Sequence, residues 1–274
     1  MSIAGRVVVL TGATGGIGLP LCRALVSAGA TVLATGRREE RLQKLAKSFP
    51  PGSVITVPAN IATPQGRTLL LDTARQCNPA PSMLVMAHAH GAFELFEEQD
   101  PAQIITMVET NLLASMLLAQ AFLPQFLKQA DAAIAVLGST FGSLAYPGFT
   151  AYSATKFGLR GFMEGLAREH ADSHVRFQYL SPRATRTDFN NDAANALNEE
   201  LGVACDDPVI VADRILRALQ TGQRRVQIGW PEKLFARING LFPEIIDRSL
   251  RRQLPAVRRH ASIHSHPLTR ELPQ

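Results

Sequence analysis

The segment YSATK, residues 152–156, places a tyrosine and a lysine four positions apart in a chain with only 3 Tyr and 5 Lys among 274 residues. If the segment is helical, Tyr152 and Lys156 lie on one face. A tyrosine hydroxyl ordinarily titrates near ~10, and a neighbouring ammonium group stabilises the phenolate and so lowers that pKa. The pair therefore predicts general acid–base chemistry by Tyr152. The alternative is a surface helix that carries an unremarkable Tyr and Lys.

A glycine-rich loop, TGATGGIG at residues 11–18, stands between an apolar run and a helical pattern that starts near Ile17. Such a loop lets the backbone approach a pyrophosphate, and the helix N-terminus supplies oriented N–H groups and partial positive charge. The glycines are spaced as GxxxGxG rather than GxGxxG, and the alternative is a glycine-rich turn that binds nothing. The loop predicts nucleotide contacts at Gly12, Thr14, Gly15, Gly16, Ile17 and Gly18.

Two arginines, Arg37 and Arg38, follow the second apolar run, where an acidic residue would accept a hydrogen bond from the adenosine ribose. A guanidinium group pairs with a 2′-phosphate, whereas an aspartate would repel it. The sequence therefore favours NADP(H) over NAD(H), with the Thr14 hydroxyl near the same phosphate. The alternative is a pair of exposed arginines at the start of a helix.

Short apolar, β-branched runs alternate with longer helical patterns along the chain. The expected strands are residues 6–11, 30–35, 53–58, 82–87, 132–138, 174–180 and 225–229, and the expected helices are 16–28, 38–47, 63–77, 101–129, 151–171 and 207–221. Runs that are apolar throughout are typical of strands buried on both faces. The alternation predicts an α/β fold with a doubly wound parallel sheet of seven strands. The segment 184–206, rich in Asn, Ala and Asp, is long enough to form a flexible lid.

The motifs TGATGGIG, Asn111, Ser139 and YSATK occur in the order and approximate spacing of the short-chain dehydrogenase/reductase family, which the chain resembles over about residues 4–230. The resemblance implies a Rossmann fold and NADP(H)-dependent oxidoreduction. It implies that Tyr152 is the catalytic acid or base, and that Lys156 holds the nicotinamide ribose and lowers the Tyr152 pKa. Ser139 would orient the substrate oxygen, and Asn111 would hold a water molecule in the proton relay.

The resemblance also implies cofactor contacts from the loops after later strands, namely Asn60, Ile61, Ala87, His88, Ala89, Pro182, Thr185 and Thr187. Three of these loops depart from the family pattern. Met86-Ala87-His88-Ala89 stands where the family often has NNAG, Asn60 where an acidic residue is common, and Pro182-Arg183 where the family has PG. None of these departures touches the four catalytic positions, so we expect them to alter the affinity for the cofactor.

The stretch TFGSLAYPGFTA, between Ser139 and Tyr152, is largely apolar and predicts one wall of a substrate pocket. Such a pocket suits a lipophilic carbonyl or alcohol, with a 3-oxoacyl thioester or another hydrophobic ketone as the leading substrate class. The alternative is that these aromatic side chains are core or dimer contacts. His88 and His90 lack the carboxylate partners of a metal site, and we expect no metal. The candidate pocket residues are His90, Phe93, Phe141, Tyr146, Phe149 and Phe189.

The composition and the first residues limit the class of protein. With 46% hydrophobic residues, a chain of 274 residues suffices for one large core. The first residues run directly into a strand, which leaves no room for a cleavable signal peptide, and no apolar run reaches the length of a membrane span. The cysteines form no CxxC pattern, which fits a reducing cytoplasm better than a disulfide scaffold or a zinc site; they are Cys22, Cys77 and Cys205.

A basic amphipathic extension, residues 231–274, follows the predicted catalytic domain at residues 1–230. From Arg224 onward the chain has ten Lys or Arg against four Asp or Glu, and apolar residues recur at helical spacing, with Pro243 dividing two short helices. The extension either lies in a membrane interface or caps the substrate pocket or a partner subunit. No aromatic-interleaved basic patch or known binding motif accompanies the charge, so we expect no nucleic-acid partner.

These observations predict a cytoplasmic NADP(H)-dependent oxidoreductase that reduces a carbonyl group on a lipophilic substrate, or runs the reverse reaction. We expect a homodimer or homotetramer with residues 101–129 and 151–171 at the interface, and peripheral membrane contact through the extension remains open. Two rivals belong to other classes of protein: a non-catalytic NADP(H)-binding regulator on the same fold, and a membrane-peripheral scaffold driven by the extension.

Overall fold

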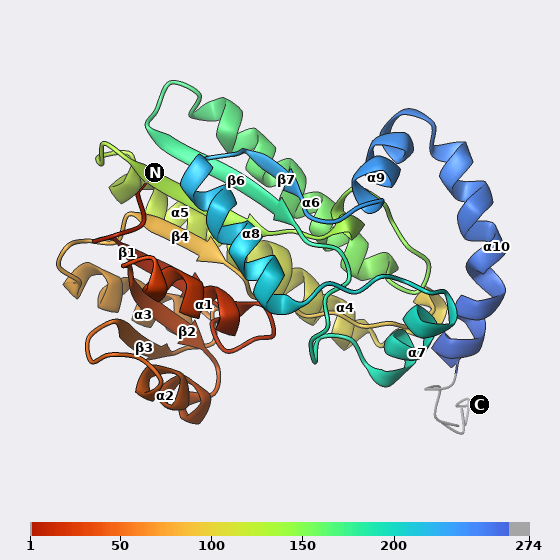
Figure 1. Cartoon of the computed structure of the whole chain (residues 1–274), viewed down its shortest axis with the longest axis horizontal. Coiled ribbons are helices and arrows are strands. Elements are labelled where there is room, and N and C mark those ends of the chain that lie inside the picture. The colour runs from red at the N-terminus through yellow and green to blue at the C-terminus, as the bar shows by residue number, and fades with distance from the viewer. Residues whose placement is uncertain (1, 263–274) are drawn as a thin grey trace, which may run out of the picture.

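The computed structural model of the chain describes residues 2–262. Its centre is a parallel sheet of seven strands in the order β3-β2-β1-β4-β5-β6-β7 (Figure 1). The sequence-based prediction of a doubly wound, Rossmann-type sheet is confirmed, and the strand order reverses between β1 and β4. The strands are β1 Val7–Thr11, β2 Thr31–Gly36, β3 Val54–Pro58, β4 Met83–Met86, β5 Ala132–Leu137, β6 Val175–Ser181 and β7 Arg225–Gln227.

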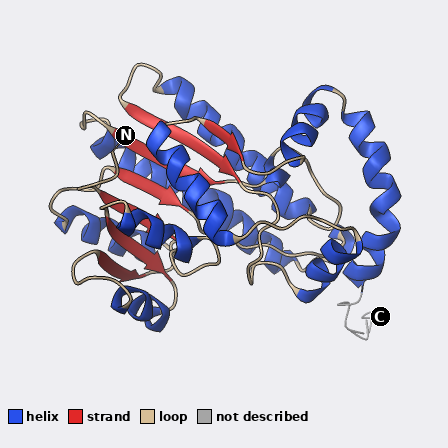
Figure 2. Cartoon of the chain, in the orientation of Figure 1, coloured by secondary structure: helices blue, strands red, loops and turns tan. Residues whose placement is uncertain are grey.

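Helices cover both faces of this sheet, as Figure 2 shows. The central strands are apolar throughout because both of their faces are buried, and every residue of β1 and β5 is buried. Because all strands are parallel, their carboxyl ends and the loops that follow them meet at one edge. One face is covered by α1 Gly18–Ser27, α2 Glu39–Lys47 and α8 Pro208–Thr221, and the other by α3 Pro64–Gln76, α5 Ala114–Phe126 and α6 Thr150–Glu169.

The region predicted as one helix at residues 101–129 consists of three helical pieces. These are α4 Pro101–Met107, the π-helical turn η2 Val108–Leu113, and α5. By length and composition alone, Pro101–Phe126 is apolar enough to cross a membrane, contrary to the expectation from the sequence. A core helix passes the same test, and the α5 side chains Leu118 and Phe122 are buried in the layer beneath the sheet. Only 33% of the apolar window is buried, however, and Ile105 and Val108 before α5 are exposed.

The segment predicted as a flexible lid, residues 184–206, contains a helix, α7 Asp192–Glu200. The helix begins where it does because the Asn191 side chain accepts a hydrogen bond from the Ala194 N–H at 2.9 Å. Its apolar face is buried against α10. The segment is thus a helical cover on the cavity side of the sheet, and the prediction overlooked Asn191 as a helix cap.

The C-terminal extension forms two further helices, α9 Glu232–Leu241 and α10 Pro243–Ser262, which Figure 1 shows in blue beside the main body. Pro243 separates them as predicted. However, α10 has 20 residues and continues through Pro255, so it is not short. The part of the predicted extension at residues 263–274 lies outside the described residues.

The two ends of α10 behave differently. Near its C-terminus, Ala256 and Val257 are buried together with Phe93 and the apolar face of α7. Here the extension packs on loops at the carboxyl edge of the sheet, but no described residue of α9 or α10 lines the cavity, so capping of the substrate pocket stays a prediction. Large apolar side chains of α9 and of the first turn of α10 are instead exposed.

Candidate active site

A cavity of about 690 Å³ opens at the carboxyl edge of the sheet. It begins at the glycine loop after β1, passes the ends of β2 and β3, and ends among the loops after β5 and β6. Asn111 is the one predicted catalytic or cofactor-binding residue that does not line it. Those that do are Gly12, Thr14, Gly15, Gly16, Ile17, Gly18, Arg37, Arg38, Asn60, Ile61, Ala87, His88, Ala89, Ser139, Tyr152, Lys156, Pro182, Thr185 and Thr187.

The glycine loop forms one wall of the cavity with its backbone, and the chain approaches itself too closely there for side chains. Gly12 has a φ of +64°, and a Cβ atom on it would lie 2.8 Å from the backbone nitrogen of His88. A Cβ atom on Gly18 would lie 2.0 Å from the Gly12 carbonyl oxygen. One on Gly16 would lie 2.3 Å from Thr187 Cβ. A bare backbone loop at the N-terminus of α1 is a donor set that fits the phosphate groups of a dinucleotide.

Three arginines gather at the end of the cavity where β2 stops. Arg37 and Arg38 precede α2, and Arg41 lies in its first turns. Within residues 2–262 none of the three has an ion pair. A Cβ atom on Gly36 would lie 3.3 Å from Thr14 Oγ1, so this hydroxyl lies at the same strand end. Unpaired guanidinium groups beside a hydroxyl fit an anionic phosphate ester.

Asn60 follows β3, and the local turn orients its side chain. The Asn60 Oδ1 atom accepts a hydrogen bond from the Ala62 N–H at 3.1 Å, and the Asn60 carbonyl accepts one from the Thr63 hydroxyl at 2.8 Å. The Oδ1 atom thus has one protein donor and one remaining acceptor site. Its contact with the adenine amino group stays a prediction.

Ser139, Tyr152 and Lys156 meet at the opposite end of the cavity. Ser139 caps the short helix η3 Thr140–Gly142, and its hydroxyl is hydrogen-bonded to that of Tyr152. Tyr152 and Lys156 lie one turn apart on α6, with the Lys156 ammonium 5.6 Å from the centroid of the Tyr152 ring. The ammonium donates to the Leu137 carbonyl at 2.9 Å, which ties α6 to the end of β5. The predicted helix therefore brings the two hydroxyls and the ammonium together.

The electrostatics of this group differ from the sequence-based expectation. Burial raises the pKa of Tyr152 well above its ordinary value, and the hydrogen bond with Ser139 only partly opposes this effect. Burial also lowers the pKa of Lys156 to about 8. In the protein alone, therefore, the pKa of Tyr152 stays above its ordinary value, because desolvation of the phenolate outweighs the interaction with Ser139.

Asn111 lies in η2, buried beneath the cavity wall. Its side chain accepts a hydrogen bond from the His90 N–H at 2.7 Å and donates to the His90 carbonyl at 2.8 Å. It also donates to the Thr155 hydroxyl at 3.0 Å. Both polar atoms of the side chain are thus engaged by the protein, and they join the loop after β4 to α6. A role for Asn111 in holding a relay water stays a prediction. Because its side chain is engaged by the protein, the backbone of Asn111 in the π-helical turn would have to bind that water.

His88 replaces the side-chain amide that the resemblance leads one to expect after β4. Its Nδ1 atom is 2.6 Å from the Thr11 hydroxyl and its Nε2 atom is 3.1 Å from the Ser115 hydroxyl. The Ser115 hydroxyl donates to the Asn111 carbonyl at 2.9 Å, so Nε2 is assigned as the protonated nitrogen. Burial, assisted by the Lys156 ammonium, lowers the pKa of His88 to about 3. A neutral imidazole thus braces β1 against η2 and α5.

The six predicted substrate-pocket residues divide into two groups. His90, Phe141, Phe149 and Phe189 line the cavity, whereas Phe93 and Tyr146 do not. The correction has a packing reason. Phe93 lies behind Phe149, with ring centroids 5.1 Å apart. Tyr146 stacks on Phe141 at 5.4 Å, and its hydroxyl donates to Gln253 of α10 at 2.7 Å.

An aromatic wall therefore surrounds the Tyr152 hydroxyl. The ring centroids of Phe189 and Phe149 lie 5.6 Å and 6.3 Å from that of Tyr152. Gly91 makes the position of Phe189 possible, because a Cβ atom at Gly91 would lie 2.5 Å from the Phe189 ring. The part of the cavity next to the hydroxyl pair is thus apolar, as a lipophilic substrate would require.

Arg183 has a different role from the one its sequence position suggested. Its guanidinium group donates to Asp206 at 2.7 Å, to the Trp230 carbonyl at 2.8 Å and to Glu232 at 3.2 Å. The hydrogen bond with Asp206 is the main cause of its raised pKa. The positive charge therefore faces two carboxylates, and it fastens the loop after β6 to the start of α9.

Several lining residues were not predicted from the sequence. Arg41 follows Arg38 by three positions in RREER, so helical spacing could have found it. Thr106, Glu109 and Asn198 line the cavity from α4, η2 and α7, and no motif marks them. Their places depend on how those helices pack.

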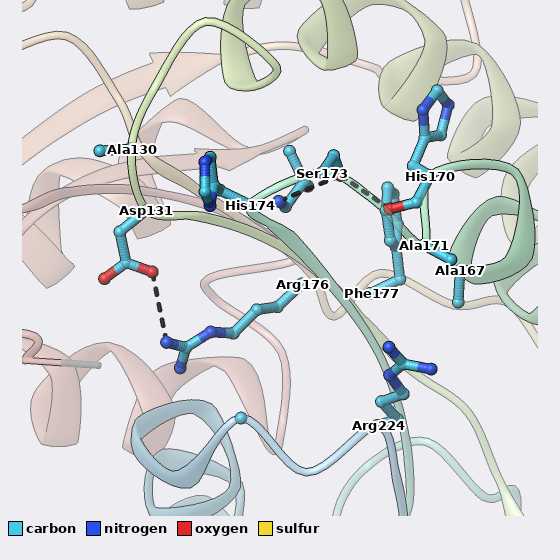
Figure 3. A pocket seen from close by; sticks show the side chains of 12 residues that line it. Ala130, Asp131, Ala167, His170, Ala171, Ser173, His174, Arg176, Phe177 and Arg224 are labelled. Atoms are coloured by element: carbon cyan, nitrogen blue, oxygen red, sulfur yellow. Dashed lines mark hydrogen bonds and ion pairs between the residues drawn. The ribbon is translucent and has the colours of Figure 1, made fainter.

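A second cavity, of about 320 Å³, lies at the amino edge of the sheet, beside the starts of β5 and β6 (Figure 3). His170, His174, Arg176 and Arg224 lie around it, and the Arg176 guanidinium pairs with Asp131 at 3.5 Å. None of the predicted site residues lines this cavity. The candidate chemistry therefore belongs to the larger cavity.

The family model for short chain dehydrogenase matches residues 6–198, and the chain therefore belongs to the short-chain dehydrogenase/reductase family. It is an oxidoreductase of this family. An oxidoreductase of Staphylococcus saprophyticus is 28% identical to it over 192 residues, which cover 69% of this chain and 78% of that protein.

Two solved structures illustrate the shared fold. A 3-ketoacyl-(acyl-carrier-protein) reductase from Brucella melitensis, complexed with NADH, has a TM-score of 0.78 at 20% identity and covers 84% of this chain and 99% of its own. A short chain dehydrogenase from Burkholderia cenocepacia, in complex with NADP, has a TM-score of 0.77 at 24% identity and covers 91% of this chain and 99% of its own. Structural neighbours thus bind either form of the nucleotide.

Proposed function

We propose that this protein is an NADP(H)-dependent reductase of carbonyl groups on lipophilic substrates, able to run in reverse as an alcohol dehydrogenase. One observation carries the proposal. The Ser139 and Tyr152 hydroxyls and the Lys156 ammonium share a single cavity with the bare glycine loop. Reacting groups and a phosphate cradle in one continuous space are what hydride transfer from a dinucleotide needs.

The protein's part in the reaction follows from these groups. When bound, the nicotinamide supplies or accepts the hydride. The Ser139 hydroxyl holds the substrate oxygen beside Tyr152, and the Tyr152 hydroxyl gives that oxygen its proton. The raised pKa of Tyr152 keeps its hydroxyl protonated at neutral pH, which favours the direction of reduction. Lys156, with its pKa near 8, is mostly protonated at pH 7 and holds positive charge next to the ring.

The preference for NADP(H) rests on the end of the cavity that carries Arg37, Arg38 and Arg41. Three unpaired cations there attract a 2′-phosphate, and a nucleotide without that phosphate leaves them unpaired. The neighbouring side chains Glu39 and Glu40 are negatively charged, but neither lines the cavity.

The proposed substrate class is a 3-oxoacyl thioester or another hydrophobic ketone. Phe141, Phe149 and Phe189 provide an apolar wall beside the reacting hydroxyls. The similarity in fold to a 3-ketoacyl-(acyl-carrier-protein) reductase is consistent with this class. Few polar groups on this wall compete for the substrate, so its apolar part supplies most of the binding.

We further propose a cytoplasmic homodimer or homotetramer. Ile105, Val108, Leu113 and Phe157 are exposed on the helices that were predicted to form the interface. A second copy of the same face would bury them. The three cysteines are free in the structure, which suits a reducing compartment.

The test combines nucleotide binding and turnover. Titration of nucleotide fluorescence should show tighter binding of NADPH than NADH, and Arg37→Gln/Arg38→Gln should remove about 10- to 100-fold of that preference, as expected for lost charge-assisted hydrogen bonds. NADPH oxidation is then followed with a panel of lipophilic ketones and 3-oxoacyl thioesters. Arg75→Gln is the matched control, since Arg75 is exposed on α3 and does not line the cavity.

The catalytic assignment is tested with Tyr152→Phe, which should keep NADPH binding and lower kcat by about 10²- to 10⁴-fold. Tyr146→Phe is its control, because Tyr146 lies behind the cavity wall. Tight NADPH binding by the wild-type protein with no turnover of any compound would favour the rival, a nucleotide-binding regulator. Full activity of Tyr152→Phe would show that the proton comes from another group.

A further inference from the structure

A cluster of large apolar side chains is exposed on the C-terminal extension, away from the cavity. We name it the corner patch, because it covers α9 and the turn into α10, which stand beside the main body in Figure 1. Exposed apolar groups that gather in one place mark a contact with a partner or a membrane. The corner patch consists of Trp230 (68% exposed), Leu234 (40%), Phe235 (41%), Leu241 (73%), Phe242 (58%) and Ile245 (56%).

Helix geometry shows that α9 turns two residues of this patch, Leu234 and Leu241, outward. The Asn239 side chain donates to the Ser143 carbonyl at 2.9 Å and so marks the face of α9 that points to the body. At about 100° per residue, Leu234 and Leu241 lie within about 20° of each other and about 140–160° from Asn239. Their exposure agrees with this placement. The side of α9 opposite its anchor therefore carries Leu234 and Leu241, whereas Phe235 lies nearer the anchor and is 41% exposed.

Basic side chains frame the corner patch. Three acidic residues, Glu232, Glu244 and Asp247, lie in the same segment, and the net charge of residues 230–252 is +2. In the part of the chain that the structure describes, none of the basic groups has an ion pair. They are exposed and free to meet an external anion. The basic residues are Lys233, Arg237, Arg248, Arg251 and Arg252.

This combination distinguishes between possible occupants. A second copy of the chain would bring the same positive charge against itself, which opposes a contact of the patch with its own image. The apolar face suited to a second copy lies instead on α4, η2 and α6, where Ile105, Val108 and Phe157 are exposed. An anionic lipid surface complements both features, because it accepts apolar side chains below its headgroups and attracts the Lys and Arg around them.

We propose that the corner patch docks the protein on membranes that contain anionic lipids. In this arrangement, Leu241, Phe242 and Ile245 enter the interface, and Arg and Lys side chains contact the headgroups. Trp230 lies at the edge of the patch, and an indole ring is favoured at the boundary between headgroups and acyl chains. The docking is peripheral and does not depend on catalysis.

The chain offers its own probe, since Trp230 is its only tryptophan. The full-length protein is mixed with vesicles of phosphatidylcholine containing about 30% phosphatidylserine, chosen to give a negative surface potential. We expect a blue shift of the tryptophan emission, protection from acrylamide, and flotation with the vesicles. Binding should weaken by about 10-fold or more with pure phosphatidylcholine, and should weaken as salt is raised.

Variants separate this proposal from its alternatives. Leu241→Ser/Phe242→Ser should abolish flotation, whereas Val209→Ser/Ile210→Ser should not, although Val209 and Ile210 on α8 are similarly exposed, at 56% and 52%. Both changes are at exposed positions, so circular dichroism should show an unchanged fold. Equal binding to neutral and anionic vesicles, or no blue shift with anionic vesicles, would overturn the proposal. A concentration-dependent blue shift without vesicles, lost in Leu241→Ser/Phe242→Ser, would assign the patch to a second copy instead.

Discussion

Replacing His88 should make the stability of the protein less sensitive to acid. In the folded chain both ring nitrogens of His88 are held by hydroxyl groups, and burial lowers its pKa to about 3. In the unfolded chain the same ring titrates near ~6.5. Between these two values the unfolded chain binds a proton that the folded chain does not. The free energy of unfolding is therefore constant with respect to this group above pH 6.5 and falls as the pH is lowered below it.

The size of the effect follows from the two pKa values. Each pH unit below ~6.5 removes about 1.4 kcal/mol from the free energy of unfolding, so a fall to pH 4.5 removes about 2.7 kcal/mol. His88 keeps some exposure to the cavity, which screens the charge. We therefore expect about 2 kcal/mol. Carboxyl groups begin to titrate in the same range, and the difference between the wild-type protein and a His88 variant removes their shared contribution.

The assay is urea-induced unfolding, followed by far-ultraviolet circular dichroism, of the wild-type protein and His88→Gln between pH 7 and 4.5. Because His88→Gln also alters the hydrogen bonds to Thr11 and Ser115, the comparison uses the change in stability with pH in each protein. The wild-type protein should lose about 2 kcal/mol more than His88→Gln over this range. His174→Gln, a change at an exposed histidine, is the control and should follow the wild type. An identical pH dependence in His88→Gln and wild type would refute the assignment of His88 as a buried neutral brace.

Two further predictions concern the frame of the cavity. Arg183→Met leaves Asp206 and Glu232 without their shared cation, and should lower the free energy of unfolding by about 3 kcal/mol and Tm by roughly 6–10 °C. Arg75→Met, in an exposed pair, should change Tm little. An unchanged Tm for Arg183→Met would mean that the ion pairs of Arg183 contribute nothing to stability. Gly18→Ala places a methyl group 2.0 Å from the Gly12 carbonyl oxygen and should weaken NADPH binding by at least about 10-fold in a fluorescence titration. Gly161→Ala on α6, where a Cβ atom meets nothing within 4 Å, should leave binding unchanged, and equal affinities of the two variants would contradict the account of the loop.

The sequence predicted the sheet well because its strands are buried on both faces. A run such as VVVLT is apolar at every position, and the strand bounds agree with the predicted ranges to within one or two residues. The glycine loop and the Tyr152–Lys156 pair could also be predicted from the sequence, since each depends on residues close together in the chain. Local spacing alone was sufficient to place them on a strand–helix turn and on one helix face.

Other features depend on contacts between distant segments, and local pattern could not predict them. Asn111 binds the His90 backbone because the π-helical turn packs against the loop after β4. Arg183 binds Glu232 only because the extension returns to the cavity. The raised pKa of Tyr152 has the same origin, since it results mainly from burial by surrounding segments. Sequence spacing indicates which groups lie near each other, whereas burial has the larger effect on their pKa values.

The order of the cavity residues along the chain has a consequence for how nucleotide specificity and substrate specificity can be exchanged by recombination. Thr14, Arg37 and Arg41, at one end of the cavity, all come from segments up to α2, whereas Ser139, Tyr152 and Phe189 come from segments beyond β5. A single crossover in the gene between α3 and β4 would exchange the first set and leave the second intact. The segment proposed to select the nucleotide and the segment proposed to select the substrate can thus be recombined separately. Such a chimera must preserve the contacts between the two parts, among them the seam between β1 and β4, where Thr11 meets His88, and the packing of α1 against α8.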